Sequence, residues 1–179
     1  MSKLIIFPTD TVYGIGCPIF DLENIAKIYK IKNRSFDKPL ACLCANVEQI
    51  ESIAYLDEKA KKIINNFLPG ALTIILKSKE EVVNKIGYKT IGVRIPNSKT
   101  ALDILSNYGP MLTTSVNDSG FAPINEYEEI VDKYSNLVDE IYPPCGESSN
   151  LSSTVISYID NEFKLIREGA ISLNDILNV

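Results

Sequence analysis

Short apolar runs alternate with amphipathic stretches along most of this chain. Apolar or alternating runs predict strands at residues 4–7, 40–44, 71–77, 90–96, 111–114, 137–141, 154–159 and 163–167. Apolar residues at helical spacing predict helices at 22–32, 47–53, 57–67, 80–86, 98–105 and 126–134, and a short last helix that begins at Ser172. The last two strands form an antiparallel hairpin. The sequence therefore predicts an α/β fold, with a mixed parallel and antiparallel sheet and helices on its faces.

The first strand ends at a segment rich in hydroxyls and glycine, Pro8-Thr-Asp-Thr-Val-Tyr-Gly-Ile-Gly16. We interpret this segment as a loop that joins the strand to the helix capped by Asp21. Loops at strand ends hold ligands in many α/β proteins, because hydroxyls, amides and carboxylates converge there. Thr, Asp and Gly are also ordinary turn residues, so the segment taken alone favours plain turn chemistry.

The composition is that of a soluble folded protein. The chain has 179 residues, of which 45% are hydrophobic and 23% charged, and this size suits one domain spanning residues 1–179. No apolar run approaches the roughly 20 residues of a membrane span, so no membrane contact is expected. The chain enters its first strand without the apolar stretch of a signal peptide, which favours a cytoplasmic location.

The chain contains four cysteines and no histidine. No two cysteines have the spacing of a zinc site, so no protein-bound metal is predicted. The lack of histidine also excludes Ser-His-Asp and Cys-His nucleophilic arrangements. Cys42 and Cys44 alternate within one strand and are expected to be buried free thiols, while Cys17 is given no catalytic role.

The net charge of the chain and its local clusters of charge lead to different predictions. The net charge of −5 argues against a surface that wraps nucleic acid, although a local basic site and weak RNA binding remain open. Lys32, Arg34 and Lys38 lie past the end of the first helix, on a loop before a strand. A solvated helix end would account for such cations. A bound phosphate or carboxylate accounts better for three of them on one short loop.

Other strands also end in polar residues. Arg94 and Arg167 each end a strand, where an arginine can also pair at the surface. Hydroxyl and amide side chains flank two more strands, namely Thr113, Thr114, Ser115 and Asn117 after one and Ser152, Ser153 and Thr154 before the other. Polar ends on four strands, together with the cation cluster, predict one shared concave site.

Six short motifs follow one another along the chain: Pro8-Thr-Asp-Thr-Val-Tyr-Gly-Ile-Gly, Lys32-Asn-Arg-x-x-x-Lys-Pro-Leu, Pro69-Gly-Ala-Leu-Thr, Gly92-Val-Arg-Ile-Pro, Thr114-Ser-Val-Asn-x-Ser-Gly and Ser153-Thr-Val-Ile. In this order they resemble the YrdC family of threonylcarbamoyl-AMP synthases, in its short single-domain form. The resemblance runs from about Ile5 to Ile171. It implies a twisted mixed sheet of the YrdC/RibB-like kind with one large concave cavity.

The resemblance also implies a reaction and its partners. Family members join L-threonine, bicarbonate and ATP into threonylcarbamoyl-AMP with release of pyrophosphate, for N6-threonylcarbamoyladenosine modification of tRNA. Such a step depends on alignment and on stabilising negative charge, so Lys, Arg and Mg²⁺ carried with ATP suffice without a protein nucleophile. A transient contact with the tRNA threonylcarbamoyl transferase complex is expected with this activity.

Residue roles follow from the motif positions. By resemblance, the catalytic residues are Lys32 and Arg34. The residues expected to bind ATP are Arg34, Lys38, Thr90, Ser115, Asn117 and Arg167. Those expected to surround the substrate threonine are Thr11, Tyr13, Arg94, Thr113 and Ser153. Thr11 is the residue of the opening segment expected to touch threonine, whereas Thr9 and Asp10 are expected mainly to shape the turn.

The chain departs from the family pattern at three points. Leu43 stands where many longer members carry a ligand-contacting histidine, so either a neighbouring group or water takes its place or threonine affinity is weaker, and Val116 replaces the usual alanine. The first strand begins almost at the N-terminus, so the helix that commonly precedes it is not expected, and part of one sheet face is either uncovered or covered by a partner. The main alternative is a paralogue of the same fold that binds nucleotide or RNA without synthase activity, because Lys89-Thr-Ile-Gly-x-Arg and Arg167-Glu-Gly resemble that branch. A pure RNA-binding module is a third interpretation.

Overall fold

The computed structural model describes residues 2–146 and 148–178 and contains a sheet of nine strands in these residues. The strands are β1 (Ile5–Phe7), β2 (Gly14–Pro18), β3 (Ala41–Leu43), β4 (Leu72–Lys77), β5 (Thr90–Arg94), β6 (Met111–Ser115), β7 (Glu140–Ile141), β8 (Thr154–Ile159) and β9 (Glu162–Arg167). Their order across the sheet is β7-β1-β2-β6-β3-β5-β4-β8-β9. Parallel and antiparallel pairs both occur, which confirms the predicted mixed sheet.

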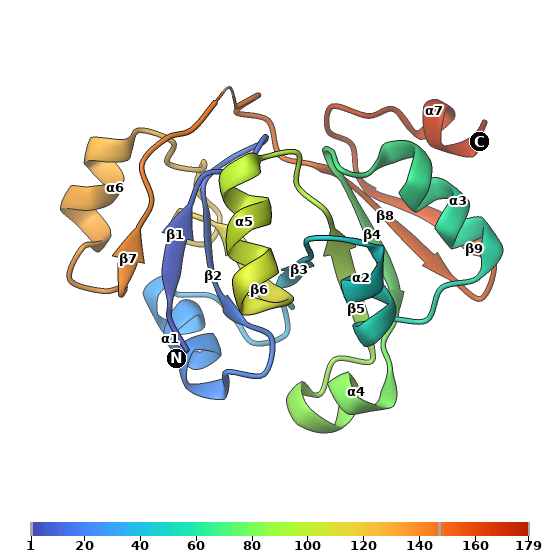
Figure 1. The fold of residues 1–179 in the computed structure, drawn as a ribbon, viewed down its shortest axis with the longest axis horizontal. Coiled ribbons are helices and arrows are strands. Elements are labelled where there is room, and N and C mark those ends of the chain that lie inside the picture. The colour runs from blue at the N-terminus through green and yellow to red at the C-terminus, as the bar shows by residue number, and fades with distance from the viewer. Residues whose placement is uncertain (1, 147, 179) are drawn as a thin grey trace.

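Seven described helices connect and cover the strands (Figure 1). They are α1 (Leu22–Ile31), α2 (Val47–Ile53), α3 (Glu58–Phe67), α4 (Glu80–Ile86), α5 (Lys99–Tyr108), α6 (Tyr127–Tyr134) and α7 (Leu173–Leu177). Asp21, Ser98 and Ser172 cap their helices as predicted, because each side chain accepts a backbone N–H of the first turn. The longest of these helices have 10 residues, and no helix in the described residues is long and apolar enough to cross a bilayer.

The prediction of one continuous loop over residues 8–16 is wrong for its last three residues. Gly14–Pro18 forms strand β2, which pairs antiparallel with β1 on one side and with β6 on the other. Glycine has low strand propensity, which hides this strand in the sequence. Tertiary packing favours it, because Ile15 and Cys17 are buried and the glycines let Thr113 of β6 approach closely. Cys17 therefore lies within a strand rather than at the end of a loop.

Gly16→Ala should destabilise the protein by about 2 kcal/mol, in the range of overpacked core substitutions. A Cβ at this position would lie 2.6 Å from Thr113 Oγ1 and 2.9 Å from the carbonyl oxygen of Leu112, so strand β6 would have to move. Urea unfolding measures the effect. Gly92→Ala is the matched control, because its nearest contact is a methyl group of Thr73 at 3.2 Å and a side chain can shift more easily than backbone. An equal loss of unfolding free energy in both variants would contradict the argument that close contact with the backbone of β6 makes Gly16→Ala the more costly substitution.

The sheet buries apolar residues on both of its faces. Ile5 and Phe7 of β1 pack with Met111 and the α5 residue Ile104 in one cluster. The intervening Ile6 belongs to a second, larger cluster that includes residues of α1, α2, α3 and α6. In Figure 1, α5 lies in front of β6, while α2 and α3 lie over the half of the sheet that carries β4, β5 and β8. Helices thus cover both halves of the sheet.

Candidate functional site

Alternate residues of neighbouring strands line a cavity of about 420 Å³ over the middle of the sheet. Residues two apart in a strand face the same side, so each strand contributes residues i and i+2. Cross-strand neighbours such as Leu43 and Arg94, or Ala41 and Thr113, therefore lie side by side in its wall. The site residues that line this cavity are Thr11, Tyr13, Arg34, Thr90, Arg94, Thr113, Ser115, Ser153 and Arg167. The structure thus brings together polar residues that are far apart in the sequence.

Arg94 is buried at the end of β5, with 6% of its surface exposed, and each of its three guanidinium nitrogens donates one hydrogen bond to a fixed acceptor. Its Nε donates to the carbonyl oxygen of Gly70 at 2.9 Å, and Nη1 donates to Thr11 Oγ1 at 2.7 Å. Nη2 forms an ion pair with Asp10. Burial lowers the pKa of Arg94, and the Asp10 carboxylate opposes this shift. Asp10 therefore does more than shape the turn, because it neutralises a buried cation at the edge of the cavity.

The turn that carries Thr11 is held by its own hydroxyls. Thr9 Oγ1 donates to the carbonyl oxygen of Val12 at 2.7 Å and accepts the backbone N–H of Thr11 at 3.2 Å. Ser148 Oγ donates to the carbonyl oxygen of Thr11, which joins this turn to the segment that follows β7. The expectation that Thr9 shapes the turn is confirmed.

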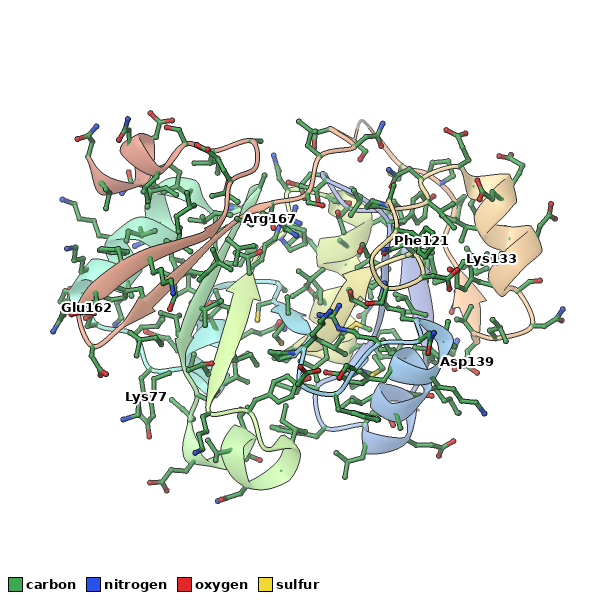
Figure 2. All side chains as sticks on the ribbon, turned by 180° about the vertical axis from the view of Figure 1, so that it is seen from behind. Lys77, Phe121, Lys133, Asp139, Glu162 and Arg167 are labelled. Atoms are coloured by element: carbon green, nitrogen blue, oxygen red, sulfur yellow. The ribbon has the colours of Figure 1, made fainter. Side chains whose placement is uncertain are left out.

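Two further arginines line the cavity from other directions. Arg34 donates from Nε to the carbonyl oxygen of Lys38 at 2.9 Å and from Nη2 to that of Pro39 at 3.2 Å. Arg167, at the end of β9, donates from Nη2 to the carbonyl oxygen of Ser153 at 2.8 Å. Figure 2 shows Arg167 near the middle of the molecule, whereas Glu162 lies at the outer tip of the same hairpin. Lys38 is exposed and does not belong to the cavity wall.

Lys32 and Asn117 do not line the cavity but lie behind Ser115. The sequence predicts Lys32 as one of three loop cations, whereas the structure buries it at the C-cap of α1 with 2% of its surface exposed. Its Nζ donates to the carbonyl oxygens of Ser115 and Asn117 and to Asn117 Oδ1, all within 2.9 Å. Burial, and then the nearby Arg34, lower the pKa of Lys32 to about 8, so the amine stays protonated at pH 7. Lys32 thereby holds the loop that carries Ser115.

Cys17 and Tyr13 are poor nucleophiles, and no cysteine lines the described cavity wall. Cys42 and Cys44 are free and buried, as predicted. Burial raises the pKa of Cys17 to about 12, which keeps it a neutral thiol at physiological pH. Burial also raises the pKa of Tyr13 to about 12, and its hydroxyl donates to the carbonyl oxygen of Tyr142 at 3.3 Å. These observations agree with a site that acts through cations and hydroxyls.

The cavity wall is positively charged although the whole chain is acidic. Its described residues include three arginines and no aspartate or glutamate. Such a wall attracts anions, since arginine binds carboxylates and phosphates through paired N–H groups. Mg²⁺ prefers carboxylate and phosphate oxygens, and the described residues contain no cluster of three acidic, histidine or cysteine side chains. The wall alone therefore does not fit a protein-held magnesium ion.

The sequence did not reveal what two polar residues do at the site. Asp10 forms the ion pair with Arg94, and only the fold reveals this contact because it joins residues 84 positions apart. Thr73 of β4 lines the cavity and exchanges a hydrogen bond of 2.8 Å with Ser153. A single threonine within the apolar run of residues 72–76 was the available signal for this residue.

A cavity lined by arginines and hydroxyls on a mixed sheet defines an α/β protein with a binding site for anionic ligands. The model of the Sua5/YciO/YrdC family, described as telomere recombination, matches residues 1–169. The chain belongs to this family, which confirms the resemblance found in its motifs.

Individual relatives show how closely the chain follows the family. It is 36% identical to a putative threonylcarbamoyl-AMP synthase of Methanocaldococcus jannaschii, over 98% of this chain and 84% of the relative. The structure of Pyrococcus abyssi Sua5 in complex with L-threonine superposes with a TM-score of 0.89 at 30% identity, over 98% of this chain and 53% of Sua5. Escherichia coli YciO superposes with a TM-score of 0.87 at 29% identity, over 98% of this chain and 87% of YciO. The chain spans about half the length of Sua5, and these matches confirm the predicted fold.

Proposed function

We propose that this protein is an L-threonylcarbamoyladenylate synthase, which joins L-threonine, bicarbonate and ATP and releases pyrophosphate. One observation carries the proposal: three arginines and several hydroxyls line a single cavity whose described wall contains no carboxylate. Each of the three substrates is anionic or carries a carboxylate, so this wall complements all of them. The names of the relatives support the same reaction, since threonylcarbamoyl-AMP synthases occur among them and Sua5 binds L-threonine.

We assign threonine and ATP to two different groups of side chains. Arg94 faces the threonine carboxylate, while Thr11, Tyr13, Thr113 and Ser153 surround the rest of that amino acid. The residues assigned to the ATP phosphates and nucleoside are Arg34, Lys38, Thr90, Ser115 and Arg167, with Lys32 and Asn117 acting through the loop of Ser115. Lys38 is assigned from its motif position, because its amine is exposed rather than in the cavity wall. Leu43 lines the wall as an apolar neighbour of Arg94 and adds no polar contact to threonine.

The chemistry needs positioning more than a protein nucleophile. The threonine nitrogen bonds to the bicarbonate carbon with loss of water, and an oxygen of the resulting carbamate attacks the α-phosphorus of ATP. The bond between the α-phosphorus and the bridging oxygen of pyrophosphate breaks in that step. Arg34 and Arg167 stabilise the negative charge on the phosphoryl oxygens, and Arg94 aligns the carbamate by holding the threonine carboxylate.

The biological setting follows from this activity. Mg²⁺ enters with ATP as the counter-ion of its phosphates, and the protein contributes no carboxylate from the described cavity wall. The product is consumed in N6-threonylcarbamoyladenosine formation on tRNA, so we expect transient contact with the tRNA threonylcarbamoyl transferase complex. A cytoplasmic location and weak RNA binding belong to the same proposal.

Pyrophosphate formation with and without threonine tests the proposed function. We expect pyrophosphate only when threonine, bicarbonate and ATP are all present, together with threonylcarbamoyl-AMP detected by mass spectrometry. Pyrophosphate release that does not depend on threonine, or no turnover at all, would contradict the proposed synthase activity. That result would favour the second candidate, a paralogue that binds nucleotide or RNA without this reaction, because the chain is also close to YciO. Direct ATP and RNA binding across a range of salt concentrations would then separate those ligands.

Arg34→Ala should raise the KM for ATP about thirtyfold while the KM for threonine changes little. The guanidinium lies in the cavity wall beside the loop 38–40, and its loss removes charge-assisted hydrogen bonds to phosphate. Steady-state pyrophosphate assays at varied ATP and at varied threonine measure the two constants. Lys30→Ala is the control, because Lys30 is exposed in the last turn of α1. If Arg34→Ala changed only the KM for threonine, the assignment of Arg34 to ATP would be refuted.

A further inference from the structure

Two tyrosine hydroxyls meet beside the loop that carries Arg34 and Lys38. Tyr29 is a buried residue of α1, with 3% of its surface exposed, and Tyr88 lies between α4 and β5. Their hydroxyl oxygens are 2.8 Å apart. Tyr29 OH also donates to the carbonyl oxygen of Lys38 at 3.1 Å, and Tyr88 OH accepts the backbone N–H of Leu40 at 3.1 Å. The pair thus contacts the chain on both sides of Pro39.

Counting donors fixes the direction of every bond in this network. A tyrosine hydroxyl has one proton to donate. Tyr29 gives its proton to the carbonyl of Lys38, which can only accept, so the bond between the two hydroxyls must be donated by Tyr88. The oxygen of Tyr88 in turn accepts from Leu40. The four groups form one directed chain, and removing either hydroxyl interrupts it.

This chain ends on the carbonyl that also orients Arg34. The oxygen of Lys38 accepts from Tyr29 and from Arg34 Nε, and the next carbonyl, of Pro39, accepts from Arg34 Nη2. Phe36 of the same loop stacks on the ring of Tyr29 with centroids 4.6 Å apart. The loop is therefore attached to Tyr29 by the ring contact with Phe36 and by the hydrogen bond to the Lys38 carbonyl. Because the carbonyls of Lys38 and Pro39 accept from Arg34, this attachment also fixes the direction of its guanidinium.

We propose that Tyr29 and Tyr88 are positioning residues for nucleotide binding, which hold the loop 34–40 so that the Arg34 guanidinium faces the phosphates of ATP. Tyr29 comes from α1 and Tyr88 precedes β5, so the two hydroxyls attach the loop 34–40 to two separate elements of the fold. Neither tyrosine lines the cavity, and both act through Arg34. The inference rests on the proposed function for the identity of the ligand.

Tyr29→Phe tests this role because it removes the hydroxyl and keeps the ring that stacks on Phe36. Tyr158→Phe is a closely matched control. Tyr158 is also buried, its hydroxyl also bonds two groups, Asp57 and Asn161, and its ring also stacks on a phenylalanine, Phe163, at 4.5 Å. Tyr158 does not line the cavity. Both variants should therefore lose a similar amount of thermal stability, and only one should lose ATP affinity.

Isothermal titration with ATP and with threonine, on the unsubstituted protein and both variants, provides the readout. We expect Tyr29→Phe to weaken ATP binding about fivefold, because it removes the hydrogen bond to the Lys38 carbonyl that orients Arg34, and to leave threonine affinity unchanged. Tyr158→Phe should bind both ligands as the unsubstituted protein does. In a double variant, Tyr88→Phe should add little to Tyr29→Phe, since the two hydroxyls belong to one network.

The possible results separate this inference from the proposed function. A protein that makes no threonylcarbamoyl-AMP but shows the ATP-specific loss in Tyr29→Phe would contradict the synthase and support the positioning role. Equal ATP affinity in Tyr29→Phe and the unsubstituted protein would overturn the positioning role. An equal loss of ATP and threonine affinity, additive effects of the two tyrosines, or no ATP binding by the unsubstituted protein would also overturn it.

Discussion

Replacing Arg94 with methionine is expected to reduce kcat/KM for threonine at least a hundredfold, with little change in the binding of ATP. The guanidinium is a buried cation of the cavity wall beside Thr11. On the proposed assignment it holds the threonine carboxylate, so its loss removes the charge-assisted hydrogen bonds of that contact. The substitution also leaves Asp10 as a charge without its partner. Breaking a buried pair on one side typically costs about 3–5 kcal/mol of stability, so the melting temperature should fall as well.

A double variant separates the lost charge pair from the lost substrate contact. Adding Asp10→Asn to Arg94→Met removes the unpaired carboxylate, so much of the lost stability should return. Threonine-dependent pyrophosphate formation should stay as low as in the single variant. Thermal unfolding and initial rates measure the two effects independently. Recovery of activity in the double variant would show that Arg94 acts on stability alone.

Lys32→Met is expected to lower the free energy of unfolding by about 3 kcal/mol and to reduce adenylate formation at least a hundredfold. Methionine fills the buried space but removes the Lys32 donor from the carbonyl oxygens of Ser115 and Asn117 and from Asn117 Oδ1, which keeps only its bond from Ser115 Oγ. Ser115 Oγ donates to Asn117 Oδ1 at 2.6 Å, so the whole turn depends on the Lys32 amine. Its collapse would move Ser115 out of the cavity wall and expose the buried end of α1.

Lys30→Met serves as the control for this substitution, because Lys30 lies two residues earlier and is exposed. We expect it to change stability by less than about 0.5 kcal/mol and to leave the rate unchanged. Urea unfolding and pyrophosphate assays on both variants provide the comparison. A stable Lys32→Met protein that has lost activity would mean that the amine touches the reacting groups directly rather than through the loop.

Local sequence patterns were sufficient for most elements of the fold. Helices α2 and α4 begin and end as predicted, and each has one clear boundary residue: Asn46 caps the start of α2, and Gly87 in the left-handed region ends α4. The hairpin of β8 and β9 was predicted from alternation around Asp160 and Asn161, which both adopt positive φ. Strand β2 was missed because its glycines carry no strand signal, and only the approach of Thr113 explains them.

The sequence by itself determined the polar ends of the strands, the cation cluster and the family motifs. These signals are local, since a residue type and its spacing decide them. The tertiary structure alone decided which charges are free to meet a ligand: it pairs Arg94 with Asp10, buries Lys32 against the loop of Ser115, and leaves Lys38 exposed. It also brought Tyr29 and Tyr88 together across 59 positions of the chain. Burial and long-range hydrogen bonds depend on the packed sheet, so residue order alone does not reveal them.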